Sequence, residues 1–214
     1  MVSRSTARQI TRHRPLTVVD LDFTVRWYQR RFHEAFVNRQ HNRLIVVCHR
    51  RWRKDEIAGQ GIAALTETQP GTYWHCFPEY KQARKAIWNG VNPWTGQRRI
   101  YDFFPQLSIK RMQDDDMFLE LHNGSTYQLL GSDRYDATVG SGPRGIIYSE
   151  WALSNPSAWA YHSPMIRESK GFAAFITTPR GNNHAKAMAE RAQTSANWLY
   201  EYQDGRYTKA LTEA

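Results

Sequence analysis

The stretch from Leu44 to Glu56, LIVVCHRRWRKDE, decides how this chain folds. An apolar run, Leu44–Cys48, stops abruptly at His49, and a cationic turn follows it. We predict a buried strand over the apolar run and a helix over Asp55–Thr66, where apolar residues recur on one face. The N–H groups of such a turn, the positive end of the helix dipole and the Lys54 ammonium would converge on one point. The stretch therefore predicts an anion site, with a phosphate as its natural occupant.

The general phosphate-loop pattern, G-x-x-x-x-G-K-S/T, provides a first test of this interpretation. Its four defining positions are occupied here by Cys48, Arg53, Lys54 and Asp55. Only the lysine matches. The stretch is weak support by itself, so the rest of the chain has to decide.

The composition favours one domain with a basic surface. With 214 residues, of which 41% are apolar, the chain can bury one good core. Its net charge of +9 makes a nucleic acid a modest favourite over a merely solvated basic surface. Residues 1–20 carry several arginines and few apolar residues, so we expect a loosely docked basic arm, with a DNA- or partner-binding arm as the alternative.

Cysteine and hydropathy patterns indicate where the protein works. Cys48 and Cys76 lie in apolar runs, which favours buried, reduced thiols over a disulfide. The histidines show no zinc-ligand spacing. No apolar run approaches the length of a membrane span, and the N-terminus lacks a signal-peptide core. We therefore expect a soluble, intracellular protein without a membrane partner.

Strand-like and helix-like segments alternate along the chain. This alternation predicts an α/β fold, with a mostly parallel sheet covered by helices on both faces. An Asn-Gly turn at Asn123-Gly124 predicts one antiparallel hairpin. The Asn155-Pro156 pair predicts a helix start. The other expected helices are Asp20–Asn38, Glu79–Trp88 and His184–Ala192, and the other expected strands are Thr72–Phe77, Met117–Leu121, Thr126–Leu130, Gly145–Glu150, Phe172–Thr177 and Trp198–Tyr202.

Polar residues end three of the predicted strands. The first strand ends at the cationic turn, another at Ser149-Glu150 and a third at Thr177-Thr178. The carboxyl ends of parallel strands form the ligand crevice of an open sheet, so these ends should face one site. A glutamate opposite a phosphate turn can orient and deprotonate a water that attacks the terminal phosphate. Taken alone, Glu150 could instead be a carboxylate that the dipole of a following helix favours.

Four ordered segments resemble the ATPase domain of phage terminase large subunits, the DNA-packaging motors. The segments are CHRRWRKDE, a variant Walker A motif; LHNGSTYQLLGSD; GIIYSEWA, a Walker B motif; and FITTPRGNNH, a coupling motif. The resemblance runs from about Trp27 to about His184. It implies a P-loop NTPase fold of the ASCE (RecA-like) class, with ATP and Mg²⁺ as ligands. It also implies double-stranded DNA, a portal protein and a small terminase subunit as partners, a homo-oligomeric ring on the portal, and the host cytoplasm as location.

The resemblance also assigns roles to residues. Glu150 would be the catalytic glutamate, assisted by Lys54 and Arg50. Gln29 would contact adenine, although without this context it reads as a surface glutamine beside core aromatics. Thr177, Thr178 and Pro179 would sense the γ-phosphate and pass its loss to parts that grip DNA. The implied nucleotide contacts are Tyr28, Gln29, His49, Arg50, Arg51, Trp52, Arg53, Lys54, Asp55 and Glu56.

Three departures from the family pattern matter. Arg53 stands where the family has a glycine, and it could point away, add a phosphate contact or obstruct the nucleotide. Asp55 and Ser149 have exchanged the usual hydroxyl and carboxylate positions, and we expect them to hold Mg²⁺ from these swapped places. The Arg-Gly pair that usually precedes Walker B reads Val139-Gly140 here. Arg144, Arg134 or Arg180 could therefore serve as the arginine finger, or none of them.

No acidic cluster follows Gly181, so we expect residues 21–214 to form an ATPase domain without nuclease activity. The favoured function is an ATP-hydrolysing motor domain that translocates viral double-stranded DNA into a capsid. A catalytically weakened nucleotide-binding assembly module and a helicase-like ATPase are the alternatives. The RGNNH segment and the Tyr-Ser-Glu-Trp strand end favour the terminase over the helicase.

Overall fold

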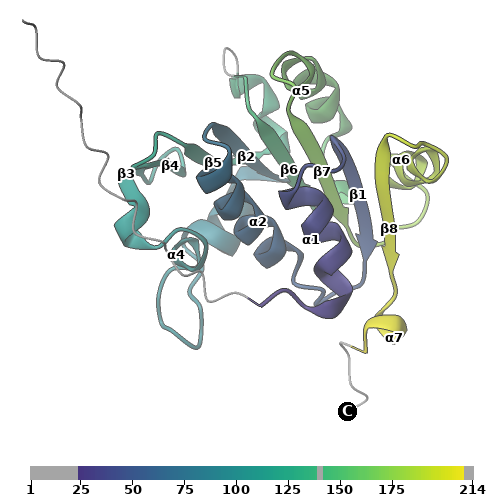
Figure 1. Cartoon of the computed structure of the whole chain (residues 1–214), viewed down its shortest axis with the longest axis horizontal. Helices are drawn as coiled ribbons and strands as arrows, with labels where there is room; N and C mark the ends of the chain where they lie inside the picture. Colours follow the sequence, from purple (N-terminus) through teal and green to yellow (C-terminus); the bar gives the residue numbers. More distant parts are fainter. Residues whose placement is uncertain (1–23, 139–141, 210–214) are drawn as a thin grey trace, which may run out of the picture.

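The computed structural model describes residues 24–138 and 142–209, and they contain one eight-stranded sheet. The strand order is β3-β4-β5-β2-β6-β7-β1-β8 (Figure 1). The strands are β1 Arg43–Cys48, β2 Thr72–Phe77, β3 Ile109–Gln113, β4 Phe118–Leu121, β5 Thr126–Gly131, β6 Gly145–Ser149, β7 Phe172–Thr177 and β8 Trp198–Gln203. The strands predicted from apolar runs are therefore confirmed, each to within about two residues.

The sheet is mostly parallel. Strands β5, β2, β6, β7, β1 and β8 pair in parallel with their neighbours, whereas β4 runs antiparallel to both β3 and β5. The hairpin predicted at Asn123-Gly124 is thus present between β4 and β5. Strand β7 lies between β1, which ends at the cationic turn, and β6, which ends before Glu150.

Helices cover both faces of the sheet, and each face has its own core (Figure 1). Helices α1 (Arg30–Val37) and α2 (Lys54–Thr68) pack on one face, where Leu44, Val46 and Ile147 point. Helices α5 (Pro156–Glu168) and α6 (His184–Gln193) pack on the other face. The apolar strands are buried on both sides, which explains why they read as continuous hydrophobic runs.

Some predicted elements differ in the structure. Residues 20–23 of the helix predicted over Asp20–Asn38 lie outside the described residues. In the rest of this range the helical part begins at the 3₁₀ turn η1 (Trp27–Gln29), which leads into α1, because the Gln29 side chain caps the extended residue Arg26. The predicted helix Glu79–Trp88 splits into α3 (Tyr80–Ala83) and a π-helical turn, η2 (Arg84–Trp88). The edge strand β3 was not predicted, because its mostly exposed polar residues show no apolar alternation.

Several short elements complete the described chain. They are α4 (Ile100–Phe103), η3 (Gln106–Ser108), η4 (Ser132–Thr138), η5 (Trp151–Leu153) and α7 (Gly205–Thr208). Helix α4 lies inside residues 90–105, a segment rich in glycine, proline and asparagine. The predicted basic arm, residues 1–20, lies outside the described residues. No helix in the described ranges is long and apolar enough to span a membrane.

Candidate functional site

The cationic turn between β1 and α2 has an unusual backbone. Arg53 is the N-cap residue of α2 and adopts the left-handed conformation, with φ 60° and ψ 43°. Arg51 is also left-handed, with φ 67°. Residues with a Cβ avoid this region, at a cost of roughly 1–2 kcal/mol each. Backbone strain of this kind is concentrated at functional sites.

Buried contacts hold the turn in this conformation. The Gln29 side chain is 2% exposed, and its Nε2 donates to the backbone carbonyl of Trp52 at 2.7 Å. The Trp52 ring is fully buried and meets the Phe32 ring edge-on. His49 Nε2 lies 2.8 Å from Thr208 Oγ1 of α7. Gln29 and Trp52 therefore support the backbone of the turn, and the predicted adenine contact of Gln29 stays a prediction.

The arginines of the turn divide into two groups. Arg50 and Arg51 are exposed, and within the described ranges their side chains make no hydrogen bond or ion pair. Arg53 instead pairs with Glu56 at 3.0 Å, and its guanidinium lies 5.8 Å from the centre of the Trp94 ring. The Arg53 side chain is thus held on the wall of a cavity of about 680 Å³ between α2 and the 91–105 segment.

Lys54 joins the three strand ends that were expected to meet. Its Nζ lies 3.0 Å from Glu150 Oε1 and donates to Thr178 Oγ1 at 3.4 Å. Burial alone would lower the Lys54 pKa and is the largest single influence. The Glu150 charge and hydrogen bond, with the nearby Cys48 and Asp55, outweigh it and raise the pKa. Lys54 is therefore a fixed cation at this edge of the sheet.

The coupling segment is tied directly to the loop that carries Glu150. Thr177 Oγ1 accepts a hydrogen bond from the Ala152 backbone N–H at 3.0 Å and donates to the Thr178 carbonyl at 3.2 Å. Glu150 itself is left-handed, with φ 54°. Pro179 is exposed beside this network. The Thr177 side chain therefore joins the backbone at Thr178 to the backbone at Ala152, two residues after Glu150.

Two buried oxygens near Lys54 lack a partner within the described residues. They are Asp55 Oδ1 and Glu150 Oε2. Ser149 is fully buried at the end of β6, next to Glu150. Carboxylate and hydroxyl oxygens are the donors that Mg²⁺ prefers. The chemistry of the Asp55 and Ser149 oxygens, one of them unpartnered, fits Mg²⁺, and their assignment as its ligands stays a prediction.

Sequence reasoning missed two residues behind Ser149. His75 Nε2 lies 2.8 Å from Ser149 Oγ, and His75 Nδ1 lies 3.0 Å from the Tyr127 hydroxyl. His75 is fully buried, and burial lowers its pKa to about 3. The one signal in the sequence was a histidine in the middle of the apolar strand TYWHCF. Its partners come from other strands and could not be read from the pattern.

The candidate arginine fingers lie in different places. Arg144 precedes β6, at the end of the strand opposite Glu150, about 16 Å away for five residues. Arg134 lies over the Tyr80 ring at 5.1 Å, beyond the carboxyl end of β5. Arg180 is exposed just after β7. The pair Val139-Gly140 lies outside the described residues.

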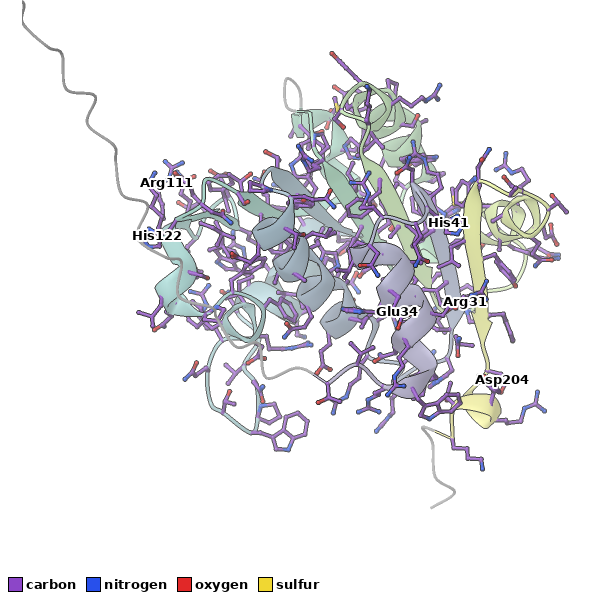
Figure 2. The ribbon with its side chains drawn as sticks, viewed as in Figure 1. Arg31, Glu34, His41, Arg111, His122 and Asp204 are labelled. Atoms are coloured by element: carbon purple, nitrogen blue, oxygen red, sulfur yellow. The ribbon has the colours of Figure 1, made fainter. Side chains whose placement is uncertain are left out.

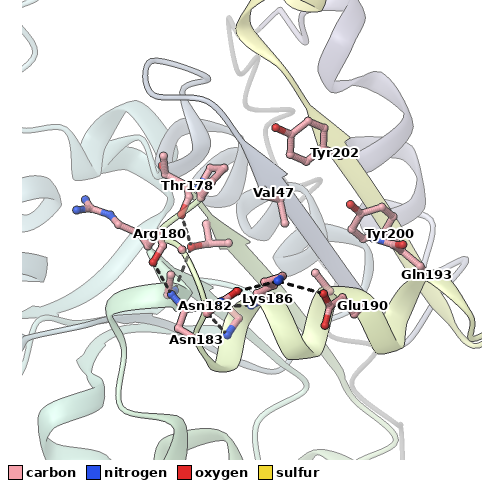
Figure 3. Close-up of a pocket in the computed structure, with 16 residues that line it drawn as sticks. Val47, Thr178, Arg180, Asn182, Asn183, Lys186, Glu190, Gln193, Tyr200 and Tyr202 are labelled. Atoms are coloured by element: carbon pink, nitrogen blue, oxygen red, sulfur yellow. Dashed lines mark hydrogen bonds and ion pairs between the residues drawn. The ribbon is translucent and has the colours of Figure 1, made fainter.

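Two further cavities flank the site. One of about 410 Å³ lies beneath the coupling segment, where Figure 3 shows Lys186 of α6 between Asn182 and Glu190, at 2.7 and 3.5 Å. Another of about 480 Å³ is lined by Trp27, Tyr28, Arg31, Glu201, Gln203 and three tyrosines of the C-terminal region. In it Arg31 reaches from α1 toward β8 and lies 3.6 Å from Glu201 (Figure 2).

Comparison with known proteins shows which solved structures share this fold. No protein-family model matches the chain, and no curated protein matches it. Solved structures do match. The large terminase ATPase domain of Thermus phage P74-26 superposes with a TM-score of 0.73 at 17% identity, over 88% of this chain and 84% of that one.

The large terminase from a thermophilic bacteriophage also matches, with a TM-score of 0.70 at 14% identity over 89% of this chain and 48% of that one. Its complex with ATP-γ-S gives a TM-score of 0.68 at 13% identity, again over 89% of this chain and over 47% of that one. The chain thus spans about half the length of those proteins. At these identities the likeness establishes the fold, and the predicted P-loop NTPase fold is confirmed.

Proposed function

We propose that this chain is an ATP-hydrolysing motor domain that powers translocation of viral double-stranded DNA into a capsid. The observation that carries the proposal is the convergence of Lys54, Glu150 and Thr178 at the carboxyl edge of the sheet. These residues come from three separate strand ends. A phosphate-binding cation, a carboxylate that can activate water and a hydroxyl sensor are the parts that phosphoryl transfer to water requires.

Lys54 and Glu150 change partners in the proposed reaction. Without phosphate, their ion pair neutralises both groups. The phosphates of ATP would compete for Lys54, assisted by Arg50 and Arg51, whose side chains extend into solvent. Glu150 would then be free to orient and deprotonate the attacking water. Thr178, which accepts a hydrogen bond from Lys54 in this structure, would sense the loss of the γ-phosphate.

Magnesium completes the proposed site. Asp55 and Ser149 would hold the ion, and the unpartnered oxygen of Asp55 supports this assignment. When bound, Mg²⁺ neutralises phosphate charge and orients the oxygens of the nucleotide. Arg53 would remain with Glu56 and Trp94, outside the path of the phosphates.

The base of the nucleotide would occupy the cavity lined by Trp27 and Tyr28. This cavity adjoins the phosphate turn, because the Tyr28 ring lies 6.5 Å from the His49 ring. Aromatic walls with a few polar groups suit a purine. The Gln29 side-chain amide already donates to the Trp52 carbonyl, so a contact with the base would have to use the same amide group.

The remaining proposals follow from the resemblance. The partners would be double-stranded DNA, a portal protein and a small terminase subunit, with a homo-oligomeric ring on the portal in the host cytoplasm. The excess of 29 lysines and arginines over 20 acidic residues supports DNA as a partner. Residues 21–214 would act as the ATPase domain, without nuclease activity, and an arginine from a neighbouring subunit (Arg134, Arg144 or Arg180) would complete the site.

A second candidate is a nucleotide-binding assembly module with weakened catalysis. The observation that favours it is Ser149, whose buried hydroxyl replaces the usual carboxylate. A helicase-like ATPase shares the upstream glutamine and the strand-end glutamate, but no further observation favours it.

Binding of a fluorescent ATP analogue, titrated with Mg²⁺, tests the proposed site. We expect Lys54→Ala to weaken affinity by about 10-fold or more, because a charge-assisted hydrogen bond contributes about 1.5–3 kcal/mol. Asp55→Ala should remove the dependence of affinity on Mg²⁺. Lys186→Ala, at an exposed position on α6, is the matched control and should bind like the wild type. Equal affinity for all four proteins would contradict the proposal.

A further inference from the structure

A chain of three buried side chains lies behind the proposed magnesium site. Tyr127 on β5, His75 on β2 and Ser149 on β6 are all fully buried on the face of the sheet that α2 covers. Their hydrogen bonds join Tyr127 to His75 at 3.0 Å and His75 to Ser149 at 2.8 Å. Three adjacent strands therefore place these polar groups in one line.

The number of hydrogens on these three side chains shows that the hydrogen bonds between them must run in one direction or the other. A neutral imidazole carries one N–H, and each hydroxyl carries one O–H, which gives three hydrogens for two hydrogen bonds. Within the described ranges the three side chains make no further hydrogen bond. One hydrogen is therefore left over, and it lies either at the Ser149 end or at the Tyr127 end.

The two ends of the chain face different surroundings. Burial is the main cause that raises the pKa of the Tyr127 hydroxyl, and the negative charge of Asp55 adds to it. Ser149 lies next to Glu150 and ends the strand at the proposed site. The negative charge of Asp55 favours a leftover hydrogen at the Tyr127 end. At Ser149 it would point a positive dipole at a bound cation.

We propose that His75 is a positioning residue that turns the Ser149 hydroxyl into an oxygen ligand for Mg²⁺. Ser149 donates its hydrogen to His75 Nε2, and His75 Nδ1–H donates to Tyr127. The hydrogen of the Tyr127 hydroxyl is then the one left over. The lone pairs of Ser149 then face the ion. This inference rests on the magnesium site of the proposed function and explains how a serine serves at a position where the family carries a carboxylate.

The opposite face of the sheet provides a matched control. His162 of α5 is also buried, with its Nδ1 2.8 Å from the Tyr148 hydroxyl and its Nε2 3.0 Å from Thr138 Oγ1. This network has the same chemistry as the His75 chain. It contains none of the proposed phosphate or metal contacts. A substitution in it therefore shows the effect of disturbing a network that has only a structural role.

The first measurement is the tautomer of His75, read from ¹⁵N imidazole shifts in the full chain with Mg²⁺ and a non-hydrolysable ATP analogue. His75→Gln identifies the signals. We expect the hydrogen on Nδ1. A hydrogen on Nε2 in this complex would overturn the inference, because Ser149 would then be an acceptor from His75.

The second measurement is the Mg²⁺ concentration needed for half-maximal binding of the same analogue. Loss of a partner behind a metal ligand typically weakens metal binding by 10–100-fold. We expect an increase of about 10-fold for His75→Gln and a smaller increase for Tyr127→Phe, which keeps the ring if His75→Gln folds poorly. His162→Gln should match the wild type. Equal values for all variants would refute the inference alone, whereas a wild type that binds no nucleotide would refute the proposed function as well.

Discussion

At the scale of single residues, the site is built from backbone conformations that residues with a Cβ normally avoid. Arg51, Arg53 and Glu150 are all left-handed, and each stands at or just before a helix that follows a strand end. The sequence alone showed only that Arg53 replaces a glycine. Its conformation and its contact with Glu56 depend on a packed turn, so neither could be read from the pattern.

Replacement of Arg53 by glycine should leave the protein more stable than replacement by alanine. Glycine adopts the φ of 60° without a steric penalty, because it has no Cβ, whereas alanine retains that penalty. Both variants lose the ion pair with Glu56, so this loss cancels between them. We expect Arg53→Gly to exceed Arg53→Ala by about 1 kcal/mol in the free energy of unfolding, measured by urea denaturation. Equal stability would show that the left-handed conformation is absent in solution.

At the scale of elements, α2 is held close to its neighbours by two glycines. A Cβ at Gly61 would lie 2.0 Å from Cε1 of Phe36, and a Cβ at Gly59 would lie 2.4 Å from Cδ2 of Phe103. Helix α2 begins at Lys54, so its position sets that of the ammonium group. Two glycines in mid-helix weaken the intrinsic helix propensity, and the close packing of aromatic rings offsets this cost.

Gly61→Ala should therefore destabilise the protein although alanine favours helices. The propensity gain is about 1 kcal/mol, and overpacking costs about 1–3 kcal/mol, with the larger values expected for a contact as close as this one. We expect a net loss of about 1–2 kcal/mol in thermal or urea unfolding. Ala64→Gly on the same helix measures the propensity effect alone. A stabilised Gly61→Ala variant would mean that α1 and α2 lie farther apart.

The elements that the sequence predicts well are those with strong local signals. Buried strands such as β1 and β7 are continuous apolar runs, and Asn155 caps α5 as expected, accepting from the Ser157 N–H. Strand β3 carries mainly polar residues, and its pairing with β4 is a tertiary event. The π-helical turn η2 likewise has no local signature. These features arise from packing that a single sequence does not display.

At the scale of the whole molecule, strand order brings the site together. Because β7 lies between β1 and β6, Thr178 and Glu150 can both reach Lys54. The rule that parallel strands present their carboxyl ends at one edge predicted this meeting. The rule did not predict the His75 chain, since its members lie inside the sheet and become neighbours only through the order β5-β2-β6.

The central claim is that Glu150 activates water in a functional ATPase. The most direct test measures ATP turnover by the full chain, with and without double-stranded DNA, beside Glu150→Gln, with nucleotide binding measured in the same samples. We expect the wild type to hydrolyse ATP, and the variant to bind ATP but to lose turnover by at least about 100-fold, the lower range of general-base catalysis. Binding by both proteins with equal turnover, or with none in either, would contradict the claim.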